Sequence, residues 1–163
     1  MTPDMELALA ARAENIAIVR HAFGGLGEAF AVSEQKLSDI RLAVTEACAN
    51  VVVHAYPDGH DGPMEILASM ADDELTVVVR DWGRGIGPRP DSPGLGLGLS
   101  LIAALAETVQ LGHGGGEHTE VRMTFALTDE TPSMSILPGT PSGAHPEGHT
   151  QRAHGRQASG HRA

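Results

Sequence analysis

The chain has 163 residues with one cysteine, 3% aromatic residues and a formal net charge of −10. One cysteine excludes an intrachain disulfide, and no apolar run approaches the roughly 18–20 residues of a membrane span. Acidity and scarce aromatic residues argue against direct binding of nucleic acid, which depends on basic residues that neutralise phosphates and on rings that stack on bases. We expect a cytoplasmic protein with one domain of ordinary size and no contact with membranes.

The charge is unevenly distributed. Residues 1–128 hold 18 acidic and 8 basic residues, whereas residues 129–163 hold three of each. The second stretch is rich in proline and glycine, has no aromatic residue, and buries too little apolar surface to offset its ordering entropy. We therefore predict a domain at 1–128 and a disordered Pro/Gly/His-rich tail at 129–163. The tail's histidines are loosely spaced and lack a cysteine or carboxylate cluster, so a metal site there is the weaker interpretation.

The first half of the domain predicts one strand and two helices. Residues 5–9 alternate in hydrophobicity as a short strand does, and residues 11–30 are alanine-rich with apolar residues near helical spacing. Ser33 is a suitable N-cap for a second helix, whose apolar stripe continues to about residue 54.

The second half predicts four more strands and a third helix. Residues 81–98 are rich in glycine and proline and therefore predict a loop, which leads into a short apolar helix at 99–106. Because strands and helices do not alternate strictly, we predict an α+β two-layer sandwich, a mixed, mostly antiparallel sheet with about three helices on one face. The four strands are predicted at residues 64–70, 75–80, 108–112 and 121–127, and the turn at residues 71–74 is predicted to join the first two as a hairpin.

Glu46 and Asn50 are four residues apart in the second predicted helix, so their side chains share one face. They interrupt an apolar run, where an unpaired charge would be costly to bury. In a pocket, Glu46 could deprotonate a hydroxyl group, and the Asn50 amide oxygen would suit Mg²⁺ beside phosphates. From this pair alone, two polar side chains at the solvent edge of an amphipathic helix are the simpler interpretation.

Asp81 follows a predicted strand and precedes glycines at alternate positions, Gly83 and Gly85. A carboxylate at the end of a strand can accept a hydrogen bond from an exocyclic amine such as adenine N6, and glycine lets the backbone approach a ligand closely. A glycine-rich turn with an Asx cap explains the same residues equally well.

Gly94, Gly96 and Gly98 alternate with leucines directly before the third predicted helix. Free backbone N–H groups at the start of a helix form an anion site. The motif is not the phosphate loop of nucleotide-binding NTPases, because no Gly-Lys-Ser/Thr follows. It is also not the dinucleotide fingerprint, which requires a parallel βαβ unit.

The order of these three motifs resembles that of the GHKL ATPase superfamily. Within it, the chain looks most like the bacterial anti-sigma factor serine/threonine kinases (RsbW/SpoIIAB-like), over about residues 5–128. The segment from Glu46 through Asn50 to His54-Ala55-Tyr56 is similar to the N-box of that branch. The resemblance implies the Bergerat, or histidine-kinase-like ATPase, fold.

The resemblance also implies a role for each matched position. Glu46 would be the general base and Asn50 the Mg²⁺ ligand that bridges the triphosphate. Asp81 would accept the adenine N6 amine, and Thr119 would lie beneath adenine, although His118 replaces the family's glycine there. The remaining positions implied to bind ATP are Gly83, Gly85, Ile86, Gly94, Gly96, Gly98 and Leu99.

By resemblance, the chain would be an ATP- and Mg²⁺-dependent kinase that binds a sigma factor and phosphorylates an anti-anti-sigma (STAS-type) antagonist, regulating transcription in a stress response as a homodimer. Arg20 matches an arginine that contacts the antagonist, although a solvated helix arginine is the plainer interpretation. Residues 87–93, the expected lid, are short for the family and hold three prolines. The alternative is therefore a nucleotide-sensing sequestering regulator of the same fold with little or no kinase activity.

Overall fold

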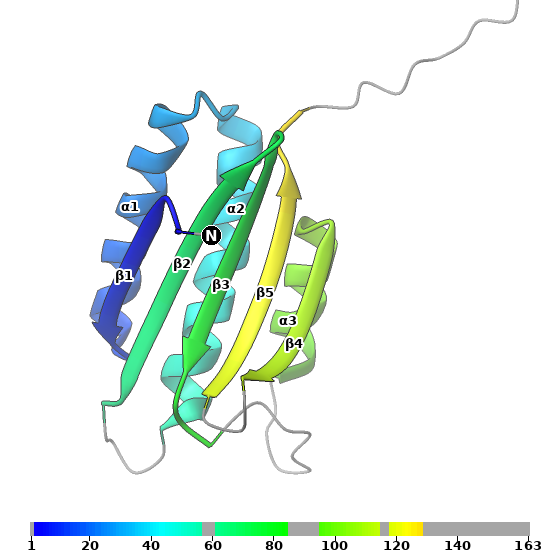
Figure 1. Cartoon of the computed structure of the whole chain (residues 1–163). Coiled ribbons are helices and arrows are strands. Elements are labelled where there is room, and N and C mark those ends of the chain that lie inside the picture. The colour runs from blue at the N-terminus through cyan, green and yellow to red at the C-terminus, as the bar shows by residue number, and fades with distance from the viewer. Residues whose placement is uncertain (1, 57–60, 85–94, 115–117, 129–163) are drawn as a thin grey trace, which may run out of the picture. The chain divides into compact units, whose positions relative to one another are not determined.

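Residues 2–56, 61–84, 95–114 and 118–128 are described by a computed structural model, and they contain five strands in one sheet (Figure 1). The sheet has the order β1-β2-β3-β5-β4, and each neighbouring pair of strands is antiparallel. All described residues belong to one compact unit, Met1–Glu130, and the predicted tail lies outside them. The strands are β1 (Met5–Ala10), β2 (Pro63–Ala71), β3 (Glu74–Asp81), β4 (Thr108–Gly114) and β5 (His118–Ala126).

Helices cover one face of this sheet (Figure 1), which confirms the predicted two-layer α+β architecture. They are α1 (Ala13–Ala29), α2 (Glu34–Asn50) and α3 (Leu95–Leu105). The predicted N-cap of α2 is confirmed, because the Ser33 hydroxyl oxygen accepts a hydrogen bond from the Lys36 N–H at 3.3 Å. Among the described helices, none combines the length and apolar character needed to cross a membrane.

The core lies between the helices and the sheet. Along β3 and β5 alternate side chains face the helices, as the period of two in a strand requires, and most of them are apolar and fully buried. Asp81 and Thr119 continue this inward alternation at the ends of the two strands and are 2% and 3% exposed. The apolar inward residues of β3 and β5 are Leu75, Val77, Val79, Val121, Met123 and Phe125.

The β2–β3 hairpin is confirmed, with Ala71 opposite Glu74 in the register. Its two turn residues, Asp72 and Asp73, have φ values of 49° and 61°. This pair of left-handed residues is typical of the two-residue turns whose twist matches that of the flanking strands, and aspartate tolerates the conformation better than most residues.

Two helix boundaries differ from the sequence prediction. The second helix does not stay α-helical to residue 54; it changes after Asn50 into a π-helical turn, η1 (Val51–Ala55). Three of the five residues of η1 are valines, whose β-branched side chains are crowded in an α-helix, and the Ala55 carbonyl is fixed by a hydrogen bond from the Arg84 N–H at 2.9 Å.

The third helix begins at Leu95, four residues earlier than the glycine content predicted. Glycine disfavours a helix by up to about 1 kcal/mol per residue relative to alanine, but packing against neighbouring helices overrides this preference. That packing is visible at Gly98, which lies against α2, and at Ile102, which is fully buried.

Candidate functional site

The α2 helix brings Glu46 and Asn50 to the side that faces α3. A Cβ atom built on Gly98 would lie 3.3 Å from both the Nδ2 and Oδ1 atoms of Asn50, and 3.4 Å from the Oε2 atom of Glu46. The first and third sequence motifs therefore meet in space. Gly98 is the residue that permits this close approach, because any larger side chain would enter the space beside the amide and the carboxylate.

Asn50 is 8% exposed, and its Nδ2 atom is buried with no hydrogen-bond partner among the described residues. A buried amide donor without a partner costs about 1–3 kcal/mol, so such groups usually have one. The orphaned donor beside the first turn of α3 is suited to a ligand that carries acceptor oxygens, such as a phosphate. If position 50 served only to pack the core, an apolar residue would be expected there.

The residues around Asn50 also fit Mg²⁺ held together with a phosphate. No cluster of three or more His, Cys, Asp or Glu side chains occurs in the described segments, so a cation bound entirely by such ligands is not built there. Mg²⁺ does not need one, since it usually takes one or two protein oxygens and completes its shell with phosphate oxygens and water. The Asn50 amide oxygen can supply such a ligand.

Asp81 lies at the end of β3, directly opposite Thr119 of β5 in the sheet register. Its Oδ1 atom accepts a hydrogen bond from the Gly83 N–H at 3.0 Å. Burial raises the pKa of the Asp81 carboxyl above its ordinary value of 3.8, and the Gly83 hydrogen bond and the nearby His118 and His113 partly offset that rise. A buried carboxylate and a buried threonine hydroxyl on neighbouring strands supply an acceptor and a donor that could recognise the polar edge of a flat ring.

Two hydrogen bonds connect the segment after Asp81 to the end of η1 and to Tyr56, which follows it, and the Tyr56 hydroxyl makes a third bond to β2. The Tyr56 hydroxyl donates to the Pro63 carbonyl at 2.5 Å and accepts from the Trp82 N–H at 2.9 Å. The Arg84 N–H donates to the Ala55 carbonyl. Gly83 lies so close that a Cβ there would overlap the Ala55 carbonyl, so glycine is required at this contact.

These hydrogen bonds connect the end of the helix that carries Asn50 to the segment that follows Asp81. The sequence marked Tyr56 only as part of a motif and gave it no role. Its hydroxyl bonds Pro63, seven residues later, and Trp82, 26 residues later, and these contacts leave no local signal in the sequence. The π-helical turn that brings Ala55 to Gly83 was also missed. Single π-helical turns are frequent at functional sites, and three successive valines were the available hint.

The other expected site residues divide into three groups. Leu99 is half-buried and packs against the core, and Gly96 lies in the first turn of α3, not in a loop as predicted. The free N–H groups of that turn still give α3 an anion-binding terminus. Arg20 lies on the exposed surface of α1, in a groove against α2. Gly85, Ile86 and Gly94 lie outside the described residues.

Comparisons with known proteins identify the family of the chain. A family model described as the histidine kinase-like ATPase domain matches residues 9–125. The serine-protein kinase RsbW of one Bacillus cereus strain is 32% identical over 127 residues, which cover 69% of this chain and 79% of that protein. The serine-protein kinase RsbW of Bacillus velezensis is 30% identical over 141 residues, which cover 77% and 87%.

A solved structure shares the fold. The crystal structure of the RsbU and RsbW domains of a Mycobacterium tuberculosis protein superposes with a TM-score of 0.60 at 22% identity. The match covers 77% of this chain and 33% of that longer one, so the chain spans about a third of the solved protein. At this identity the likeness shows the architecture: an antiparallel sheet with helices on one face.

Proposed function

Since the chain belongs to the histidine kinase-like ATPase family and is RsbW-like within it, we propose that it is an ATP- and Mg²⁺-dependent serine/threonine protein kinase. The observation that carries this proposal is the meeting of Glu46, Asn50 and Gly98 around an orphaned buried amide. A polar cluster of this kind is unexplained by packing, and it lies where the first turn of α3 offers free N–H groups to a phosphate.

In this proposal the chain holds the nucleotide at two ends. The Asp81 carboxylate accepts a hydrogen bond from the adenine amine, and Thr119 lies beneath the adenine ring. Gly83, Gly85 and Ile86 shape the adenine pocket. Gly94, Gly96, Gly98 and Leu99 hold the phosphates at the start of α3. The Asn50 oxygen would hold Mg²⁺, which would supply charge neutralisation for the triphosphate.

Glu46 is the proposed catalytic residue. Its carboxylate lies beside Gly98, and therefore beside the turn that would hold the terminal phosphate. There it would accept the proton of a seryl or threonyl hydroxyl as that oxygen attacks the γ-phosphorus and the bond to the β-phosphate breaks. Phosphoryl transfer depends mainly on positioning and charge neutralisation, so one base on a rigid helix suffices.

The proposed partners follow from the RsbW relatives. We propose that the chain binds a sigma factor and phosphorylates an anti-anti-sigma (STAS-type) protein, as a cytoplasmic homodimer that makes no direct contact with nucleic acid. Arg20 is the proposed contact for the antagonist, and its exposure on α1 supports that role. Exchange between two partners would follow from linkage, because each gains from the nucleotide state that it prefers.

Calorimetry with ATP and Mg²⁺ tests the nucleotide site. Asn50→Ala and Asp81→Asn should each weaken binding at least tenfold. Asp72→Asn, in the β2–β3 turn, is the matched control for the second change, because asparagine tolerates the left-handed backbone there. Absence of binding by the wild type, or unchanged binding by both variants, would remove the site assignment.

Transfer of labelled phosphate to a purified STAS-type protein tests the kinase step. Glu46→Gln should abolish transfer and keep ATP affinity within about threefold, whereas Glu34→Gln at the start of the same helix should change neither. Binding of ATP without transfer by the wild type would favour the sequestering regulator over the kinase. Transfer that survives Glu46→Gln would leave the kinase in place and exclude this base.

A further inference from the structure

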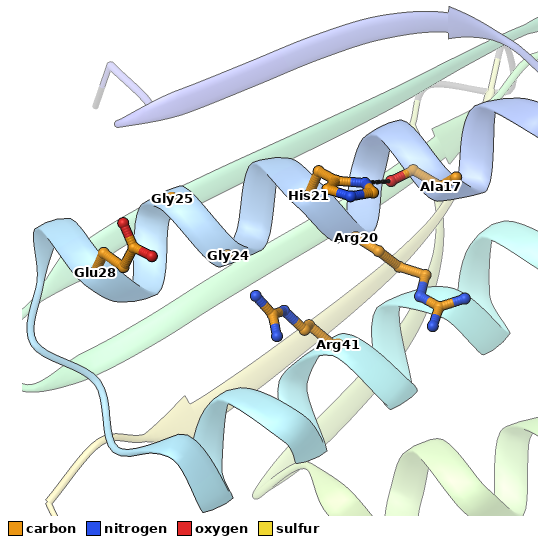
Figure 2. A pocket seen from close by; sticks show the side chains of 7 residues that line it. All are labelled: Ala17, Arg20, His21, Gly24, Gly25, Glu28 and Arg41. Atoms are coloured by element: carbon orange, nitrogen blue, oxygen red, sulfur yellow. Dashed lines mark hydrogen bonds between the residues drawn. The ribbon is translucent and has the colours of Figure 1, made fainter.

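A cavity of about 510 Å³ lies in the groove between α1 and α2, away from the Asn50 cluster (Figure 2). Arg20 and His21 contribute to it from α1, and Arg41 from α2. A second cavity of about 400 Å³ is lined by the same two arginines together with Ser38, Leu42 and Thr45 of α2. Figure 2 shows the two guanidinium groups projecting into the space between the helices.

Neither Arg20 nor Arg41 has a hydrogen bond or an ion pair within the described segments, and the Nε atom of Arg41 is buried without a partner. Other arginines of the chain are paired: Arg12 with Asp61, Arg80 with Glu65 and Glu120, and Arg122 with Glu120. In a chain with ten more acidic than basic residues, two unpaired guanidinium groups that share one groove are unexpected. An anion in this groove would neutralise positive charge that no carboxylate of the described segments pairs with.

The groove is also shaped for Arg41. Gly24 of α1 lies so close to the Arg41 guanidinium that a Cβ there would collide with its Nη2 atom. The His21 Nδ1 atom lies 2.7 Å from the Ala17 carbonyl oxygen, which can only accept, so this hydrogen bond holds the imidazole ring against α1 at the side of the cavity. Glu28 is the carboxylate that lines the cavity, and Figure 2 shows it farther along α1 than Arg20 and His21, close to the end of the helix.

We propose that this groove is a binding site for a compact oxyanion, a phosphate or a carboxylate group, held between Arg41 and Arg20. Guanidinium groups match both anions with paired N–H donors in a fixed plane, which a lysine would not. The cavity is within the size range of small-ligand pockets and exceeds one oxyanion, so the anionic group belongs to a larger molecule or enters with water. The proposal rests on Arg41 and the cavity, and it does not depend on whether the chain is a kinase.

The test observes the two guanidinium groups directly by NMR. In the full chain labelled with ¹⁵N, the Nε–H signals of Arg41 and Arg20 are followed while sodium phosphate is added at constant ionic strength against sodium chloride. A parallel titration uses a short peptide with two adjacent glutamates. We expect a saturable shift of both signals. Saturation by phosphate at the lower concentration identifies a free phosphate ligand, and saturation by the peptide at the lower concentration identifies an acidic polypeptide.

Variants separate a specific site from general attraction. Arg41→Gln, followed at the Arg20 signal, and Arg20→Gln, followed at the Arg41 signal, should each weaken binding at least tenfold. Arg122→Gln should leave the affinity unchanged, because that arginine pairs with Glu120 on the sheet. Arg41→Lys keeps the positive charge and loses the planar guanidinium group, and it should bind the anion at least threefold more weakly than the wild type. This variant replaces Arg41→Gln as the test if Arg41→Gln does not fold.

The titration is repeated on Asn50→Ala, so that phosphate bound at the nucleotide site is not mistaken for this one; the Arg41 shift should persist. No saturable shift with either anion, or an affinity that none of the Arg20 and Arg41 variants lowers, would overturn the proposal. Because no nucleotide is present, that outcome would leave the kinase proposal standing.

Discussion

Replacing Gly98 by alanine should separate the stability of the fold from its capacity to bind a nucleotide. In a helix, alanine is favoured over glycine by up to about 1 kcal/mol, and somewhat less near the end, where Gly98 is the fourth residue of α3. The new methyl group would lie 3.3 Å from the Asn50 amide and 3.4 Å from the Glu46 carboxylate. Both contacts are a few tenths of an ångström too short, which costs on the order of 1 kcal/mol.

These two terms nearly cancel, so the free energy of unfolding should change by less than about 1 kcal/mol. Nucleotide binding has no compensating term, because the methyl group fills the space beside the orphaned amide that a phosphate or its Mg²⁺ would use. The loss of one charge-assisted contact, about 1.5–3 kcal/mol, corresponds to at least a tenfold weaker affinity.

Chemical denaturation and calorimetry with ATP and Mg²⁺ measure the two effects. Gly25→Ala on α1 is the control, since a Cβ there meets nothing within 4 Å; it should stabilise the fold and leave nucleotide affinity unchanged. If Gly98→Ala binds ATP within twofold of the wild type, the space beside Asn50 is not the phosphate site and the reasoning is wrong.

Three further predictions concern other parts of the structure. Burial raises the pKa of Asp81, so the folded state holds that proton more tightly than the unfolded state, and stability should fall as pH rises from 3.8 through the raised pKa. Asp81→Asn should remove this step in denaturation curves and make the nucleotide-free protein more stable at pH 7. Tyr56→Phe removes the hydroxyl that bonds both the Pro63 carbonyl and the Trp82 N–H. It should lower the free energy of unfolding by about 1–3 kcal/mol and alter the fluorescence emission of Trp82, the sole tryptophan. Unchanged stability and unchanged emission would contradict the structural role of these two hydrogen bonds. Burial raises the pKa of Cys48 to about 12, so its thiol should resist iodoacetamide at pH 8 in the folded protein and react in guanidinium chloride; rapid labelling of the folded protein would contradict the burial.

The sequence predicted the architecture well because its local signals agree with the tertiary structure. Alternating residues in β3 and β5, the Ser33 cap and the Asp72-Asp73 turn are each decided by neighbours a few positions away. Where local preference and packing disagree, the prediction was wrong: the glycines of α3 argued for a loop, and contact with α2 made them helical.

The site was predictable as a set of motifs and not as an arrangement. Spacing alone put Glu46 and Asn50 on one face, but nothing local relates them to Gly98, nearly fifty positions later. The Tyr56 hydroxyl bonds and the Arg41 groove arise in the same way, from segments that meet only after folding. In the groove, Arg20 was noticed by resemblance, while its partner Arg41 gave no signal in the sequence.

The net negative charge of the chain is compatible with anion binding once the folded structure is considered. An excess of acidic residues argued against binding phosphates through a basic patch, and the proposed nucleotide site uses none of the arginines described here: an amide, a helix terminus and Mg²⁺ carry the attraction. An amide and the N–H groups of a helix terminus would hold a triphosphate only in a fixed, partly dehydrated geometry, to which the close approach at Gly98 and the hydrogen bonds of Tyr56 would contribute. The unpaired arginines stand elsewhere, between α1 and α2, where an oxyanion can be attracted without competing with the nucleotide.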